Sequence, residues 1–268
     1  MRGHNLWIYV MAVAAGIALL YLGIGRIGST AALLSDQELS NGNLIRAWVS
    51  SSLVLDLEFD EGGGTTAYDS SPYHSDGTIF GASWTSNPPY VGYALDFDGT
   101  DDYVQVSDSE SLNPAGAITV EGWMYVRSWD DSINDPGWPR LLQHESAYRA
   151  FVHAWGMNFG VWDNVGALFE AGGGPPGGMA LDTWFHFCGT AERDGRVKLY
   201  YDGVEIADVA GPSNAFGAAT DVLRIASDLQ GRKVDGIIDR VRVYNRALSP
   251  EEVFYSYLVS HSHYHGGP

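Results

Sequence analysis

The sequence has one cysteine, only two lysines and no long amphipathic helical pattern, and each scarcity narrows the possible interpretations. With Cys188 alone, no internal disulfide framework can form. This cysteine lies in the alternating segment WFHFCGT without an activating pattern beside it, which predicts a buried thiol rather than a nucleophile. Without long amphipathic helices, the remaining patterns favour β-structure.

Basic residues are also scarce. The 268 residues contain 15 Lys and Arg against 33 Asp and Glu, a formal net charge of -18. So acidic a surface repels nucleic acid and anionic lipid head groups, and we expect no nucleic-acid partner. It suits Ca²⁺, cationic partners or neutral glycans.

Hydrophobic residues make up 45% of the chain, enough for a large core, and glycine and aromatic residues are frequent. This composition favours many short strands joined by tight turns. The length allows one large all-β domain or two small ones.

The N-terminal region predicts export. Arg2 precedes an uncharged run of 20 residues from Leu6 to Gly25, long enough for a membrane span or the apolar part of a signal peptide. We assign residues 1–32 as a signal peptide or membrane anchor and residues 33–51 as a polar N-terminal segment. Cleavage is expected after Ala32. An uncleaved anchor, which contacts the membrane only through residues 6–25, is the alternative.

The segment GSTAA followed by LLSDQELSNGNLIRAW resembles the export signature of TasA/camelysin biofilm-fibre proteins, which SipW-type signal peptidases cleave. It differs at Leu33 and Leu34, where that family usually has an aromatic residue. Both interpretations place the rest of the chain outside the cytoplasm, secreted or at the cell surface.

From residue 52 onward the pattern has period two, starting with LVLDLEF at 53–59. Asp202-Gly203, between RVKLYY and VEIADV, predicts a type I′ hairpin turn. Regular short strands separated by turn signals predict one antiparallel β-sandwich over residues 52–258. We expect AGGGPPGGMA at 171–180 to be a flexible loop within it.

The end of the pattern predicts a strand and then a helix. Residues 236–244 alternate, and we expect Ile237, Asp239, Val241 and Val243 to share one face. Ser249-Pro250-Glu251-Glu252 then has the features of a capping box at a helix start.

Residues 259–268 form a histidine-containing tail. His261, His263 and His265 alternate, so an extended tail would present three imidazoles on one side to Zn²⁺, Ni²⁺ or Cu²⁺. The other interpretation, which we favour, is an unstructured C-terminus.

Two segments carry a family resemblance. DGIIDRVRVYNRALSPEE at 235–252 and LEFDEGGGTTAYDSSPYHSDGT at 57–78 are similar to the ends of concanavalin A-like LamG (laminin G-like) domains, with LDFDGTDDYVQV, ITVEGW, DTWFHFCGT and VKLYYDGVEI in the expected order between them. The resemblance implies a concanavalin A-like jelly roll. It leaves function open, because this fold hosts lectins, adhesins, enzyme accessory modules and hydrolases. Arg240 stands where the family usually has Glu.

The resemblance also implies a structural Ca²⁺ where the first and last strands meet. Asp60, Asp69 and Asp239 would be its ligands, with Asp76 nearby, because Ca²⁺ takes carboxylate and carbonyl oxygens. The alternative is that Asp60 and Asp69 bond their own turns and Asp239 pairs with an arginine.

Catalysis has little support. Laminarinase-type glycosidases of this fold carry E-x-D-x-x-E, and the nearest string here is Glu58-Phe59-Asp60, without the second glutamate. Glu121 is isolated in TVEGWMYV, and no zinc or Ser/His/Asp spacing is present.

The segment from Trp129 to Trp138 combines aromatic and polar side chains in a long loop. Sugar rings stack on exposed tryptophans while Asp and Asn bond hydroxyls, so we predict a ligand site at Trp129, Asp131, Asn134 and Trp138. Trp123 and Trp184 are expected in the core.

The sequence therefore predicts an exported, non-catalytic recognition module that binds carbohydrate at the cell surface or in a matrix, with a glycan or a surface protein as partner. The first alternative is a structural or adhesive subunit of an extracellular fibre or surface assembly. A glycoside hydrolase is a weaker one.

Overall fold

The computed structural model describes residues 52–86, 92–130 and 138–264. They form strands, one 3-10 helix and one α-helix. In chain order these are β1 (Leu53–Leu57), β2 (Thr66–Ala67), β3 (Gly77–Phe80), β4 (Ser83–Ser86), β5 (Tyr93–Asp98), β6 (Tyr103–Val106), η1 (Glu110–Leu112), β7 (Ala117–Ser128), β8 (Arg140–His144), β9 (Tyr148–His153), β10 (Gly156–Trp162), β11 (Leu168–Gly173), β12 (Trp184–Glu192), β13 (Arg196–Tyr201), β14 (Val204–Ala210), β15 (Leu223–Ile225), β16 (Asp235–Tyr244) and α3 (Pro250–Tyr264).

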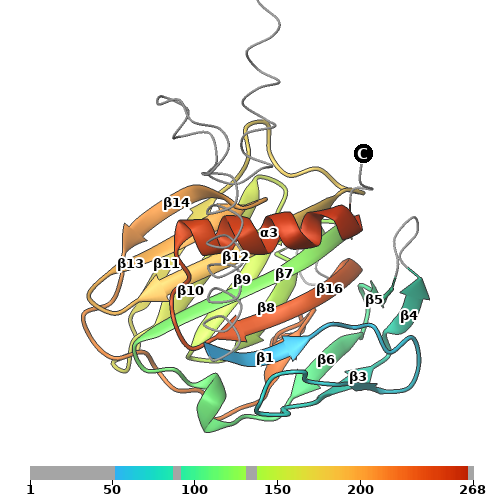
Figure 1. Cartoon of the computed structure of the whole chain (residues 1–268), viewed down its shortest axis with the longest axis horizontal. Coiled ribbons are helices and arrows are strands. Elements are labelled where there is room, and N and C mark those ends of the chain that lie inside the picture. Colours follow the sequence, from blue (N-terminus) through green and yellow to red (C-terminus); the bar gives the residue numbers. More distant parts are fainter. Residues whose placement is uncertain (1–51, 87–91, 131–137, 265–268) are drawn as a thin grey trace, which may run out of the picture. The chain divides into compact units, whose positions relative to one another are not determined.

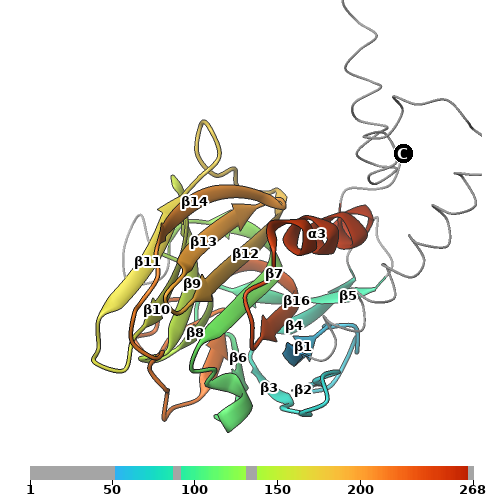
Figure 2. The same ribbon diagram turned by 60° about the vertical axis from the view of Figure 1, so that its left-hand side comes forward.

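The strands form two antiparallel sheets that pack face to face (Figures 1 and 2). Sheet A has the order β14-β13-β12-β7-β16-β5-β4, and β1 also pairs with β16. Sheet B has the order β11-β10-β9-β8-β15-β6-β3-β2. The predicted antiparallel β-sandwich is confirmed.

Apolar side chains from both inner faces fill the space between the sheets. Phe97, Phe159, Phe185 and Phe187 are almost completely buried there, and each such ring contributes about 1.5–3 kcal/mol by leaving water. The Phe159 ring fits only because β12 has Gly189 opposite it, where a Cβ atom would stand 2.1 Å from the ring. Cys188 is buried and unpaired, as predicted.

Helix α3 covers the outer face of sheet A over β7 and β12 (Figure 2). Trp123 and Trp184 project from these strands and are buried with Tyr257 of the helix, and the Trp123 and Tyr257 rings stack 5.8 Å apart. Both tryptophans are thus buried as predicted, although under the helix rather than between the sheets.

The start of α3 forms the predicted capping box. The Ser249 amide donates to Glu252 Oε2 at 2.8 Å, and the Glu252 amide donates to Ser249 Oγ at 3.3 Å. Arg246 adds a two-pronged ion pair to the Glu252 carboxylate at 2.7 and 2.8 Å.

The helix continues to Tyr264, into the segment predicted to be a tail. The prediction of an extended or unstructured tail is therefore wrong for positions 259–264. A helical backbone gives positions 261 and 263 no common face, so the alternation no longer predicts a one-sided histidine set there. His265 lies outside the described residues.

The prediction that Ile237, Asp239, Val241 and Val243 share one face of β16 is wrong, because the strand contains a bulge. The β7–β16 register shifts between Asp239 and Arg242, and Arg240 has a φ of 51°, which marks a β-bulge. Because one extra residue reverses the alternation, Val241 and Val243 face the core while Ile237 packs outward against the tryptophan cluster under α3.

The β13–β14 hairpin confirms its predicted turn, since Asp202 and Gly203 both have positive φ, 49° and 74°. The predicted loop at 171–180 begins too early, because residues 171–173 belong to β11 and pair with β10.

The predicted signal or anchor lies outside the described residues, as does the polar segment up to residue 51. Within residues 52–86, 92–130 and 138–264, no helix has the length and apolar character needed to cross a membrane.

Candidate functional site

The outer face of sheet B over β9, β10 and β11 carries polar side chains in cross-strand register. Arg149, Gly160 and Glu170 stand opposite one another on the three strands. Because Gly160 has no side chain, Arg149 reaches across it and pairs with Glu170 Oε2 at 2.7 Å. A Cβ atom at Gly160 would lie 3.1 Å from that same oxygen. The glycine therefore makes room for the ion pair.

Three further contacts extend this pair along the face. Asn158 Nδ2 donates to Glu170 Oε1 at 3.1 Å, and His153 Nε2 lies 3.1 Å from Asn158 Oδ1. The Trp155 amide donates to His153 Nδ1 at 3.2 Å, so Nδ1 is an acceptor and Nε2 carries the proton. We call Arg149, His153, Asn158 and Glu170 the cross-strand ladder.

Aromatic rings flank the cross-strand ladder. Trp155 is 67% exposed, with its ring centroid 5.9 Å from that of His153. Trp138 is 46% exposed and lies 6.0 Å from the Phe151 ring. Fixed hydrogen-bonding groups beside exposed aromatic rings are what a sugar-binding surface needs.

Buried ion pairs hold this face rigid. Arg140 lies over the Phe151 ring at 4.6 Å and pairs with Asp228 Oδ2 at 3.0 Å. Arg232 pairs with the same oxygen at 2.8 Å. Arg149 also lies over the Phe151 ring, at 5.2 Å, and 5.1 Å from the Trp162 ring. These contacts fix the positions of the side chains beside the cross-strand ladder.

The predicted ligand residues are only partly brought to this surface. Trp138 is at its edge, whereas Trp129 is half-buried and packs against the interior core. Asp131 and Asn134 lie outside the described residues. The cross-strand ladder was not predicted, although the alternation in YRAFVHAW indicates that Arg149 and His153 share one face.

The predicted calcium ligands have other partners. Both Asp69 carboxylate oxygens accept hydrogen bonds, Oδ1 from the amides of Asp56 and Ser71 and Oδ2 from Ser71 Oγ and the Ser75 amide, all at 2.7–2.8 Å. Asp60 Oδ1 accepts from the Tyr93 amide at 3.0 Å.

Asp239 is buried in β16 opposite Trp123. Asp69 thus has the turn role that was the alternative interpretation, and the Ca²⁺ set stays a prediction. Within the described ranges, the group of carboxylates whose oxygens lie within 4.8 Å of one another is Asp98, Asp101 and Asp102.

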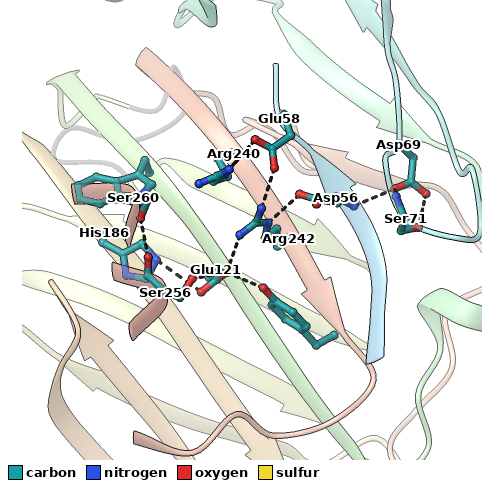
Figure 3. A network of polar contacts seen from close by, with 12 residues as sticks. Asp56, Glu58, Asp69, Ser71, Glu121, His186, Arg240, Arg242, Ser256 and Ser260 are labelled. Atoms are coloured by element: carbon teal, nitrogen blue, oxygen red, sulfur yellow. Dashed lines mark hydrogen bonds and ion pairs between the residues drawn. The ribbon is translucent and has the colours of Figure 1, made fainter. Parts of the chain in front are cut away.

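A second polar cluster lies on the outer face of sheet A under α3 (Figure 3). At its centre Glu121 Oε1 accepts from Tyr244 Oη at 2.7 Å and from Ser256 Oγ of the helix at 2.9 Å. His186 Nε2 lies 3.6 Å from Oε2, and Arg242 Nη1 lies 3.8 Å from Oε1. The helix closes over this carboxylate, so the cluster fastens α3 to the sheet.

The same cluster includes Glu58, which belongs to the string Glu58-Phe59-Asp60 that is nearest to a glucanase motif. Glu58 pairs with Arg240 at 2.7 Å and with Arg242 at 2.7 Å (Figure 3). Arg242 also pairs with Asp56 at 2.7 Å. These ion pairs join the end of β1 to β16 and balance the negative charge of Glu58, which gives the glutamate a structural role.

Comparison with known proteins agrees with this architecture. Residues 98–254 match a family model described as the concanavalin A-like lectin/glucanases superfamily. No curated protein matches the sequence.

Several solved structures share the fold. The binding domain of Paraclostridial Mosquitocidal Protein 1 has a TM-score of 0.65 and 14% identity, over 78% of this chain and 52% of that chain. The botulinum neurotoxin serotype D ligand-binding domain in complex with N-acetylneuraminic acid has a TM-score of 0.63 and 13% identity, over 80% of this chain and 52% of that chain. The botulinum neurotoxin DC binding domain in complex with rat synaptotagmin II has a TM-score of 0.59 and 15% identity, over 79% of this chain and 52% of that chain. The chain spans about half the length of these structures.

Proposed function

The chain belongs to the concanavalin A-like lectin/glucanases superfamily, and from that membership we propose that it is a non-catalytic carbohydrate-binding module. The proposed site is the outer face of sheet B over β8 to β11. The observation that carries this proposal is the exposed Trp155 ring beside the cross-strand ladder.

The chemistry of the face suits a sugar. Trp155 and Trp138 offer flat apolar surfaces for the C–H faces of sugar rings. The cross-strand ladder offers donors and acceptors that are already held in place, so hydroxyl groups bind without a large ordering cost. The structural neighbours include domains solved with N-acetylneuraminic acid and with rat synaptotagmin II, which supports a glycan or a surface protein as partner.

Binding of the full-length protein to a glycan array, followed by titration calorimetry with the best ligand, tests the proposal. We expect Trp155→Ala to weaken binding at least tenfold, about 1.4 kcal/mol. Tyr68→Ala is the matched control, because Tyr68 is 60% exposed next to the distant edge strand β2 and should leave affinity unchanged. Equal affinity in the wild type and the Trp155 variant would exclude this surface.

We also propose that the protein is exported and acts at the cell surface or in a matrix, from the apolar run at residues 6–25 and the small-residue exit that follows. Mass spectrometry of the exported protein should find an N-terminus at Leu33. An intact Met1 on membrane-bound protein would instead show an uncleaved anchor.

A further inference from the structure

Two cationic side chains in the described part of the chain have no carboxylate partner. Among the lysines and arginines of the described ranges, all except Arg224 and Lys233 form an ion pair with an acidic residue. This is unexpected in a chain with 33 acids and 15 bases, where partners are abundant. The two residues also lie together, which makes the exception a local feature.

Both cations lie over one aromatic ring. Arg224 Cζ is 4.5 Å and Lys233 Nζ is 5.0 Å from the centroid of Tyr103. Phe80, which is 39% exposed on the neighbouring strand, stacks on the same ring at 4.7 Å. We call Phe80, Tyr103, Arg224 and Lys233 the cationic subsite. It combines an apolar ring surface with two positive charges.

The cationic subsite is on the same face of sheet B as the cross-strand ladder. Arg224 of β15 is in register with Gln143 of β8, and Gln143 is in register with Arg149 of β9. Neighbouring strands lie about 4.8 Å apart, so the Arg224 and Arg149 backbones are about 10 Å apart. One short oligosaccharide can therefore contact both.

Several polar atoms in this row have unused bonding capacity. Arg224 Nε and Gln143 Oε1 are buried without a hydrogen-bond partner. Lys233 is 8% exposed, and burial, followed by the charge of Arg224, lowers the pKa of its amine. A charge held in this way is stabilised when an anion binds.

Asp228, which follows β15, does not fill that role. Asp228 is already paired with Arg140 and Arg232, and only its backbone oxygen accepts from Arg224 Nη1, at 3.3 Å. Asp101 and Asp102 lie close enough to favour the charged amine of Lys233 but form no ion pair with it.

We propose that the cationic subsite binds the anionic group of an acidic sugar, with Arg224 and Lys233 on the carboxylate or sulfate and Tyr103 and Phe80 against the ring. The inference rests on the proposed function and specifies its ligand class as an acidic rather than a neutral glycan. The net charge of -18 repels anions at long range. Two unpaired cations in direct contact reverse this preference at short range.

A glycan array of neutral, uronate-containing, sialylated and sulfated oligosaccharides tests the ligand class with the full-length protein. We expect the bound glycans to carry a carboxylate or a sulfate, and the separate arms identify which one. Binding to neutral glycans alone would overturn this inference and leave the proposed function intact. Binding to no glycan would overturn both.

Matched substitutions test the residues. Lys233→Gln and Arg224→Gln should each weaken binding of the acidic glycan at least tenfold. The controls are Lys198→Gln and Arg196→Gln on β13 of sheet A, whose side chains pair with Glu205 and Asp208 and should leave affinity within twofold. Unchanged affinity in both subsite variants, with unchanged melting, would overturn the proposal.

A labelling experiment on the unmutated protein covers the case in which a variant does not fold. Lys198 and Lys233 are the only two lysines, so mass spectrometry resolves the acetylation of each amine. The acidic glycan should protect Lys233 and leave Lys198 reactive. Equal acetylation of Lys233 with and without saturating glycan would contradict the proposed contact.

Discussion

At the residue scale, surroundings rather than residue type decide what each carboxylate does. Glu121 is an isolated acid in the sequence, yet the fold gives it several partners under α3. Burial acts to raise the pKa of Glu121, but the interaction with His186, 3.6 Å away, together with Arg242 and Tyr244, outweighs burial and holds the pKa at about 2. Its negative charge is therefore part of the fold.

The sequence could not reveal this role, because the partners are remote. Ser256 lies 135 residues from Glu121 along the chain. Trp155 and the cross-strand ladder present the same difficulty, since the residues that form the site come from three strands. Alternation shows which side chains share a face but not which strand lies beside which.

We predict that Glu121→Gln destabilises the protein by about 3 kcal/mol at pH 7. The carboxyl pKa is near 4.5 when unfolded and about 2 when folded, so the stabilisation is complete above pH 4.5 and is lost as the pH falls towards 2. The free energies of unfolding of the wild type and the variant, measured by denaturant melts at a series of pH values, should converge over that range.

Glu251→Gln is the control, because Glu251 is exposed in the first turn of α3 and should cost only a few tenths of a kcal/mol through the helix dipole. If the difference in free energy of unfolding between the wild type and Glu121→Gln stays constant from pH 7 to pH 3, the charge of Glu121 does not stabilise the fold.

At the element scale, local chemistry predicted the features that depend on neighbouring residues. The Asp202-Gly203 turn and the Ser249 capping box were both predicted from sequence and are present. The β16 bulge was not, because Arg240 does not ordinarily indicate positive φ. The glycines at 172 and 173 predict a loop where β11 continues, because glycine usually weakens a strand.

We predict that Ser249→Ala costs about 1 kcal/mol, because it removes the acceptor for the Glu252 amide. Urea melts measure this cost. The loss should exceed that of Glu251→Gln, because Glu251 takes no part in the capping box. If Glu251→Gln proves the more damaging of the two, the cap does not stabilise the terminal helix.

At the scale of the whole molecule, the two sheets have different tasks. Helix α3 covers the outer face of sheet A and makes its central strands part of a second core. The outer face of sheet B carries no such helix among the described residues, and the cross-strand ladder and the cationic subsite lie in one row on it. We infer that sheet B is the recognition face of the sandwich.

The net charge of -18 also bears on the predicted Ca²⁺. Any cation relieves the self-repulsion of so acidic a surface, so added salt alone should raise the melting temperature. A bound ion differs because it acts at a defined site. Both Asp69 oxygens accept hydrogen bonds within its own turn region. Asp60 and Asp239 are then the remaining predicted carboxylate ligands, and the Leu57–Val241 pairing joins the segments that contain them.

We predict that Ca²⁺ stabilises the protein beyond this screening effect. At a hundred times its Kd, a ligand that binds only the folded state adds about 2.7 kcal/mol. Calorimetry in Ca²⁺, in Mg²⁺ and in NaCl of equal ionic strength separates the two effects, because only a specific site distinguishes Ca²⁺ from the other salts. Asp60→Asn should abolish the Ca²⁺ increment, whereas Asp101→Asn should retain it. Melting that is the same in all three salts, and unchanged by excess chelator, would mean that the acidic surface is screened but holds no structural ion.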